Sequence, residues 1–180
     1  MELTQNPSVL ELVRKTAELT TPKEIVWIDG SEAQLESLRK IAVETGELIK
    51  LNEEKLPGCY LNRSDVNDVA RVEGRTFICS RTREEAGPTN NWMDPDEMKA
   101  KLHEILRCAM AGRTMYVIPY SMGVIGSPFA KYGIEVTDSI YVVLNMAIMT
   151  RIGTKVLDAL GDSSDVILGV HSKVTLDPEN

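Results

Sequence analysis

Half of the arginines in this sequence gather in one short stretch. Five of the ten lie there: Arg63, Arg71, Arg75, Arg81 and Arg83. A guanidinium pairs bidentately with a carboxylate or a phosphate, so such a group suits an anionic substrate. The formal net charge of −7 means that an anion would have to be met by a local group of this kind, and it argues against nucleic acid as a partner.

Acidic residues are interleaved with these arginines. They are Asp65, Asp68, Glu73 and Glu84. Alternation over residues 69–73 predicts a strand with Arg71, Glu73 and Arg75 on one face. From the residues alone, we favour a solvated strand face whose charge pairs contribute little stability.

Other motifs that would carry chemistry are missing from the sequence. It holds no Gly-x-x-x-x-Gly-Lys-Ser/Thr phosphate loop and no Gly-x-Ser-x-Gly nucleophile motif. His103 and His171 are the two histidines, and they do not show the spacing of a transition-metal site. We therefore predict no catalytic residue, no metal ligand and no bound cofactor for this chain alone, and a surface position for His103.

Three capped helices are predicted. Asn6-Pro7 begins a helix that Pro22 ends, Ser31 and Gln34 begin a second that stops at Gly46, and Asp94-Pro95 begins a third that runs to Gly112. A further short helix is expected over residues 156–160.

Apolar runs between the helices predict strands at 25–28, 48–51, 59–61, 76–79, 115–118, 133–136 and 166–170. Residues 86–93 read as a loop, and Pro119 is expected to end the pairing of its strand. Residues 140–152 should be strand at first and helix later. The alternation predicts a single α/β domain, a mixed β-sheet flanked by helices.

The loop after Pro119 holds two glycines and a proline between apolar residues. Met122, Val124, Ile125 and Phe129 would form an apolar patch over residues 122–129. If the chain is part of a larger protein, this patch is predicted to cause self-association.

Ordered runs around this loop carry a resemblance. They are Gly112–Pro119, Ser121-Met122-Gly123, Gly126-Ser127-Pro128, Gly133-Ile134-Glu135, Thr137-Asp138-Ser139, Tyr141-Val142-Val143 and Ile148–Arg151, with Asp68–Glu73, Val156–Asp162 and His171-Ser172 outside it. In these runs the chain resembles the N-terminal part of the GTP-dependent phosphoenolpyruvate carboxykinases, whose members are much longer.

The resemblance implies a carboxykinase N-terminal (substrate-binding) domain over residues 1–180, without the C-terminal nucleotide- and metal-binding domain. It implies the parent reaction of gluconeogenesis, in which oxaloacetate and GTP give phosphoenolpyruvate, GDP and CO₂ with manganese or magnesium. Arg71 matches the arginine that contacts oxaloacetate or phosphoenolpyruvate, and Glu73 a glutamate associated with lid closure. The isolated chain is expected to be inactive and to bind these substrates weakly.

Two other hypotheses remain open. One is a stand-alone anion-binding or regulatory module derived from that domain, and the other is a purely structural α/β domain. No apolar run is long enough to span a membrane. The start lacks a signal-peptide pattern, and Cys59, Cys79 and Cys108 are expected to be free thiols, so a cytoplasmic location is predicted.

Overall fold

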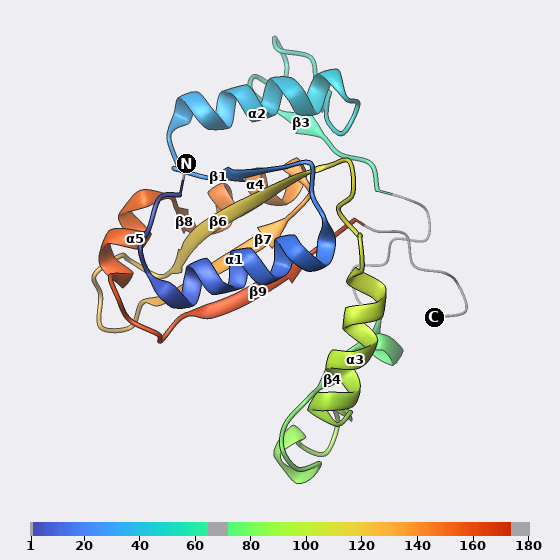
Figure 1. The fold of residues 1–180 in the computed structure, drawn as a ribbon. Helices are drawn as coiled ribbons and strands as arrows, with labels where there is room; N and C mark the ends of the chain where they lie inside the picture. The colour runs from blue at the N-terminus through green and yellow to red at the C-terminus, as the bar shows by residue number, and fades with distance from the viewer. Residues whose placement is uncertain (1, 65–71, 174–180) are drawn as a thin grey trace. The chain divides into compact units, whose positions relative to one another are not determined.

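The computed structural model describes residues 2–64 and 72–173 of the chain. These residues form two compact units (Figure 1). The first unit combines the residues up to Arg63 with those from Cys108 onward, and the second is Ser64–Arg107. Each unit is described by itself below.

A mixed β-sheet is the centre of the first unit. Its main strands run in the order β1-β6-β7-β9, and β8 also pairs with β6. The β6–β7 pair is antiparallel, whereas β1 lies parallel to β6 and β9 parallel to β7. The strands are β1 (Glu24–Trp27), β6 (Thr114–Met122), β7 (Lys131–Thr137), β8 (Arg151–Ile152) and β9 (Ile167–His171).

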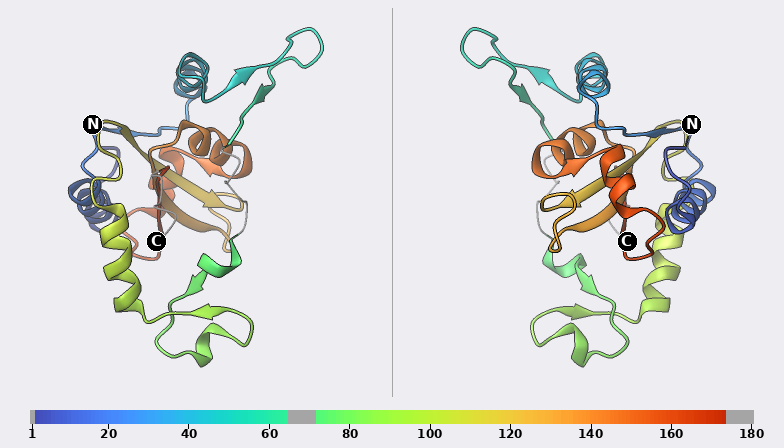
Figure 2. Two further views of the ribbon diagram at one scale, coloured as in Figure 1. Left: turned by 90° about the vertical axis from the view of Figure 1, so that its right-hand side faces the viewer. Right: turned by 90° about the vertical axis from the view of Figure 1, so that its left-hand side faces the viewer.

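Helices cover both faces of this sheet, as Figure 2 shows from two sides. One face packs against α1 (Pro7–Thr20) and α5 (Thr154–Leu160), and the other against α2 (Glu32–Glu44) and α4 (Ile140–Met149). The prediction of an α/β fold with a mixed sheet flanked by helices is confirmed. Among the described residues, no helix is both long and apolar enough to cross a membrane.

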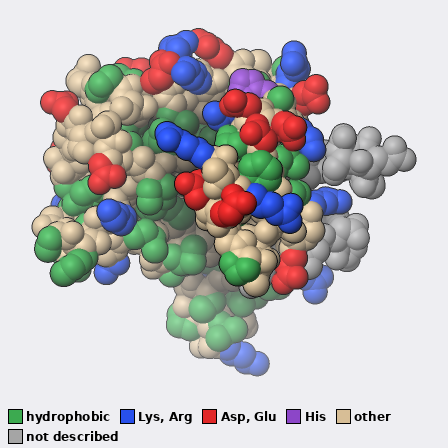
Figure 3. All heavy atoms as spheres, turned by 90° about the horizontal axis from the view of Figure 1, so that it is seen from below, with side chains coloured by type: hydrophobic (Ala, Val, Ile, Leu, Met, Phe, Trp, Pro, Cys, Tyr) green, Lys and Arg blue, Asp and Glu red, His purple; other side chains and the backbone are tan. Residues whose placement is uncertain are grey.

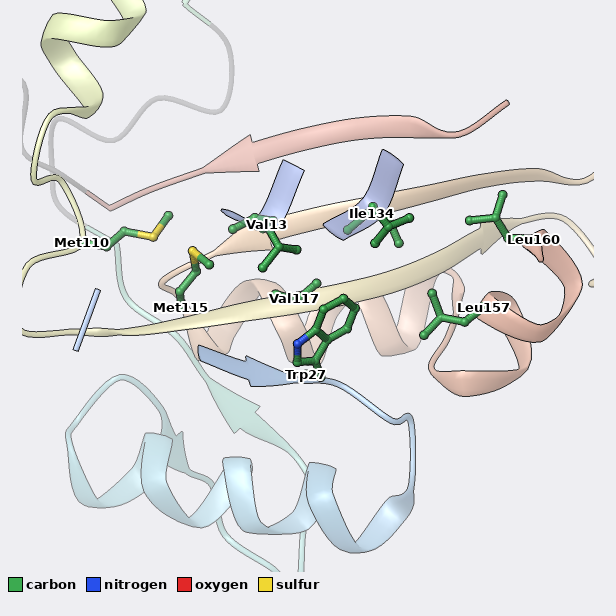
Figure 4. Packing of buried hydrophobic residues seen from close by; sticks show 10 residues of the cluster. Val13, Trp27, Met110, Met115, Val117, Ile134, Leu157 and Leu160 are labelled. Carbon is green, nitrogen blue, oxygen red and sulfur yellow. The ribbon is translucent and has the colours of Figure 1, made fainter. Parts of the chain in front are cut away.

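Period-two alternation along β6 divides the core into two clusters. Met115 and Val117 point to the α1 side, where Trp27 and Ile134 join them (Figure 4). Tyr116 and Ile118 belong to the cluster on the α4 side. Successive side chains of a strand face opposite ways, so one apolar run supplies both layers.

The predicted start of α1 is confirmed and also joins distant parts of the chain. The Asn6 side-chain oxygen accepts hydrogen bonds from the amides of Ser8 and Val9 at 3.0 and 3.2 Å. Its amide nitrogen donates to the carbonyls of Gly161 and Ser163, just beyond α5. Asn6 is 1% exposed, so these contacts satisfy a buried amide.

Two short strands after α2, both predicted from the sequence, form a hairpin. β2 (Ile49–Lys50) pairs antiparallel with β3 (Tyr60–Leu61) around the Pro57-Gly58 turn. Figure 2 shows this hairpin extending from the end of α2.

The expectation that Pro119 ends the pairing of its strand is wrong, because β6 continues to Met122 and pairs with β7 from Tyr116 to Met122. The Val117 carbonyl accepts from Ile28 and the Pro119 carbonyl from Gly153, each at 2.9 Å, so odd-numbered residues of β6 direct their backbone groups away from β7. The missing N–H of proline therefore costs the β6–β7 ladder nothing.

The expectation of a strand at the start of residues 140–152 is also wrong, since α4 begins at Ile140. Ser139 is its N-cap and accepts from the amide of Val142 at 3.4 Å. Ile140, Val143 and Leu144 are buried in the α4-side cluster. Capping and burial of one helical face override the strand preference of β-branched residues here.

The second unit contains short elements and little core. They are η1 (Glu73–Arg75), β4 (Phe77–Ile78), η2 (Glu84–Ala86), β5 (Asn91–Trp92) and α3 (Pro95–Leu106). β5 lies within the predicted loop and pairs parallel with β4. The α3 helix ends at Leu106 instead of Gly112, because the Arg107 backbone leaves the helical region. Among the described residues of this unit, Ala86 alone is buried.

Candidate functional site

Arg71, the predicted substrate-binding residue, and Glu73, the residue predicted to act in lid closure, differ in what is known of them, because Arg71 lies outside the described residues. Glu73 is described, and it begins η1 with its side chain exposed. Its main-chain oxygen accepts a 2.7 Å hydrogen bond from the side chain of Asn91. Both roles stay predictions.

The local backbone differs from the predicted strand. Glu73 and Arg75 lie in a 3₁₀ turn, in which the Arg75 amide donates to Val72 at 3.1 Å. Side chains in such a turn are about 120° apart per residue, so residues 73 and 75 do not share one face. The expectation of one charged strand face is therefore wrong for these two residues.

Three of the four side chains predicted to form the apolar patch between β6 and β7 are exposed, and the fourth, Ile125, is half-buried. Met122, Val124 and Phe129 are 53, 66 and 88% exposed. The Tyr132 hydroxyl accepts from the amide of Gly126 at 2.9 Å, which helps to fix the loop's shape. Self-association through these side chains stays a prediction, for which sedimentation at high concentration is the measurement.

A buried carboxylate organises the end of β7. The Asp138 side chain is fully buried, accepts a hydrogen bond from Arg113 Nε at 2.8 Å and forms an ion pair with Arg113 Nη2 at 2.7 Å. It also accepts from the Ser172 hydroxyl at 3.0 Å and from the Lys173 amide at 2.9 Å. Arg113 additionally donates to the carbonyl of Ala109. Asp138 therefore ties the start of β6 to the chain that leaves β9.

A second carboxylate meets the first turn of α4. Glu47 accepts from the Ser139 hydroxyl at 3.0 Å and from the amide of Tyr141 at 2.9 Å, and it pairs with the Lys173 ammonium at 3.2 Å. A carboxylate at a helix N-terminus is favoured by the helix dipole. Glu47 thus fixes α4 and the segment after β9 to the end of α2.

We call the group of Glu47, Arg113, Asp138, Ser139 and Lys173 the polar corner. In it, each charge meets an opposite charge, and both carboxylates accept several hydrogen bonds. Such groups hold backbone segments in place instead of presenting a free acid or base. Thr137-Asp138-Ser139 was singled out in the sequence only by the family resemblance, without a role. Arg113 and Asp138 are 25 positions apart, and no local spacing signals their contact.

Unlike these acids, Glu135 lies over a glycine of the neighbouring strand, Gly169. A side chain at Gly169 would overlap its carboxylate, and one at Gly133 would overlap the ring of Tyr120. Burial raises the pKa of Glu135. Burial, and then the charge of Glu135, raise the pKa of Tyr120. Glu135 was named only within the run Gly133-Ile134-Glu135 and was given no role, because its environment depends on Gly169 of a neighbouring strand.

A groove of about 500 Å³ lies between α2, the β2–β3 hairpin and α4. Its lining includes Arg39, Tyr60, Tyr141 and Ile148. The Arg39 guanidinium is already paired with Glu32 at 2.5 Å and Glu36 at 3.2 Å. The arginine of this groove is therefore already paired with carboxylates, unlike the free guanidinium that is expected to bind an anionic substrate at Arg71.

Charges on the surface are mixed in sign. Figure 3 shows acidic and basic side chains interspersed over one face, with hydrophobic groups between them. All three cysteines are free thiols, as expected, and His103 is exposed, as predicted. Within residues 2–64 and 72–173, no three His, Cys, Asp or Glu side chains are grouped so that they could hold a metal ion.

Comparison with known proteins decides the family. A model of the phosphoenolpyruvate carboxykinase N-terminal domain matches residues 11–180. The chain belongs to this family. The resemblance found in the sequence is thereby confirmed.

Relatives named "Phosphoenolpyruvate carboxykinase [GTP]" match almost the whole chain. The protein of Anaeromyxobacter dehalogenans strain 2CP-C is 52% identical over 176 residues, which are 98% of this chain and 30% of the relative. That of Corynebacterium kroppenstedtii is 54% identical over 169 residues, 94% of this chain and 27% of the relative. That of Neocallimastix frontalis is 52% identical over 167 residues, 93% and 28%. The chain thus spans about 30% of the length of these carboxykinases.

Proposed function

We propose that this carboxykinase N-terminal domain is the substrate-binding part of a GTP-dependent phosphoenolpyruvate carboxykinase, a gluconeogenic lyase of the cytoplasm. The parent reaction converts oxaloacetate and GTP into phosphoenolpyruvate, GDP and CO₂ with manganese or magnesium. The observation that carries the proposal is the identity of about half the residues over 93–98% of the chain with relatives of that name.

The role proposed for this chain is to hold the anionic substrate through Arg71, with Glu73 acting in lid closure. A guanidinium fits because its donors match the two oxygens of a carboxylate or phosphate. The nucleotide and the metal are assigned to the part of the enzyme outside this chain. The chain alone should therefore not turn over oxaloacetate with GTP and manganese above a heat-killed control.

Titration with phosphoenolpyruvate, followed by NMR, tests the role of Arg71. One charge-assisted contact contributes about 1.5–3 kcal/mol, so we expect a dissociation constant of about 1 mM or weaker. Arg71→Ala should abolish the shifts, and Arg71→Lys should restore little because an ammonium lacks the planar fork.

Arg75→Ala is the matched control, because Arg75 is a nearby exposed arginine in η1. It should keep the binding of phosphoenolpyruvate. The proposal for Arg71 fails if Arg71→Ala binds as well as the parent chain. It also fails if that variant only lowers Tm, which would indicate an arginine paired within the fold.

A further inference from the structure

The outer edge of β9 is a strand edge to which the described residues give no partner. β9 pairs with β7 alone, on one side, and lies at the margin of the sheet (Figure 1). The hydrogen bonds of Val117 and Pro119 set which backbone groups of β6 face β7, and the β6–β7 and β7–β9 registers carry that alternation outward. As a result, the backbone N–H and C=O groups of Gly169 and His171 point toward β7. Those of Leu168 and Val170 point away from the sheet.

The side chains of β9 are apolar on both sides of the sheet. Ile167, Leu168 and Val170 are 51, 47 and 40% exposed. Parallel strands with apolar residues on both faces are normally covered. Strand edges that remain open usually carry a lysine, a proline or a bulge. Residues 167–170 contain no lysine and no proline, and they pair with β7 without a bulge. The residue composition of β9 is therefore typical of a strand that has a neighbour on each side in the sheet.

The backbone at the end of β9 is already fixed. His171 contacts the Thr137 hydroxyl at 2.9 Å, and Asp138 accepts from Ser172 and from the Lys173 amide. A strand held straight in this way loses little further conformational freedom when another strand pairs with it. The edge is thus preorganised for strand addition.

We propose that the outer edge of β9 pairs with a further β-strand, supplied by the polypeptide that lies beyond the matched region in the longer carboxykinases. This rests on the proposed function, in which the chain is one part of such an enzyme. The matched region covers 27–30% of the relatives, so most of their length is available to supply the strand. A strand of the same polypeptide loses no translational freedom on pairing.

A second copy of this chain is the weaker candidate for that edge. Two β9 strands could pair around a two-fold axis, but each offers only five residues. A stable interface buries about 1,600 Å² in total, and one short strand pair supplies a small part of that area.

Amide hydrogen exchange, measured residue by residue by NMR, tests the proposal. In this chain, the amides of Leu168 and Val170 should exchange more than about tenfold faster than those of Gly169 and His171. In the full-length Corynebacterium kroppenstedtii enzyme, the two aligned outward amides should be as slow as the inward ones. Equal, fast exchange of the outward amides in both proteins would overturn the proposal.

Two other outcomes would also overturn it. Protection of Leu168 and Val170 that grows with the concentration of this chain would indicate a second copy. Protection in this chain at every concentration would mean that the edge is covered within these 180 residues.

A proline scan gives an independent measurement. Leu168→Pro removes only an outward N–H, so in this chain its Tm should match that of Leu168→Ala within about 2 °C. In the full-length relative, proline at the aligned position should lower Tm by several degrees more than alanine does. If the proline and alanine variants of the full-length relative have equal Tm values, the edge is not paired there and the proposal fails.

Failure of this proposal is distinguishable from failure of the proposed function. Phosphoenolpyruvate titration reports on Arg71, whereas the exchange pattern reports on β9. An unpaired edge in the full-length enzyme together with Arg71-dependent binding would reject strand addition alone.

Discussion

The helices α1 and α3 begin in the same way and end in different environments. Asn6-Pro7 and Asp94-Pro95 each place a capping side chain before a proline, and both caps accept two backbone amides. The apolar stripe of α1 is buried against the sheet, whereas α3 has no buried residue and its Leu102 is 43% exposed. A cap therefore determines where a helix begins, but a second layer is needed to bury its stripe.

This difference extends to the two units as wholes. The first unit has two apolar clusters on the faces of a sheet, while the second has Ala86 as its one buried residue among those described. Stability within a protein follows buried contacts, so we expect the second unit to open at lower free energy. Trp27 lies in the first unit and Trp92 in the second, so Trp27→Phe and Trp92→Phe backgrounds can report on each unit separately.

The largest effect is expected from shortening a core side chain of the first unit. Ile134→Ala should lower the free energy of unfolding by roughly 2–5 kcal/mol, because Ile134 is fully buried and a cavity would remain. Leu102→Ala in α3 should lower it by less than about 1 kcal/mol. Urea unfolding followed by tryptophan fluorescence measures both. An equal cost for Leu102→Ala would show that the α3 stripe is covered in solution.

Replacing one aspartate in each unit should give a smaller difference in unfolding free energy between the two units. Asp138→Ala should cost about 3 kcal/mol, because it leaves Arg113 and the Lys173 amide without their acceptor. Asp94→Ala removes only a helix cap and should cost about 1 kcal/mol, seen as lost helicity of α3. Thermal unfolding in the two tryptophan backgrounds measures each. A negligible cost for Asp138→Ala would contradict the structural role given to the polar corner.

The smallest effect concerns Glu135 and depends on pH. Burial raises its pKa in the folded chain, so the folded state binds the proton more tightly than the unfolded state does. Stability should therefore fall as pH rises from the unfolded pKa through the folded one. Glu135→Gln should raise Tm by a few degrees at pH 7, and this gain should vanish near pH 4.

Glu104→Gln is the matched control, because Glu104 is an exposed carboxylate of α3. It should leave the dependence of Tm on pH unchanged. A drop in Tm at pH 7 for Glu135→Gln would mean that the ionised carboxylate stabilises the fold, contrary to the effect expected of its partial burial.

The sequence by itself determined the features that depend on neighbouring residues. Three helix starts were predicted from capping residues, because a cap acts within one turn of the helix. The capping residues are Asn6-Pro7, Ser31 with Gln34, and Asp94-Pro95. Apolar runs predicted β1, β6, β7 and β9 to within a few residues, and ordered motifs from Gly112 to Gly153 predicted the family.

Only the tertiary structure decided the features that depend on partners far along the chain. Pro119 continues its strand because its missing N–H faces away from β7, and residues 140–143 are helical because Ser139, Glu47 and the sheet fix that turn. Arg113 and Asp138 meet across 25 positions, and Glu135 lies half-buried over a glycine of another strand. Local propensity cannot encode these outcomes, because each is set by which strand, helix or charge lies opposite in space.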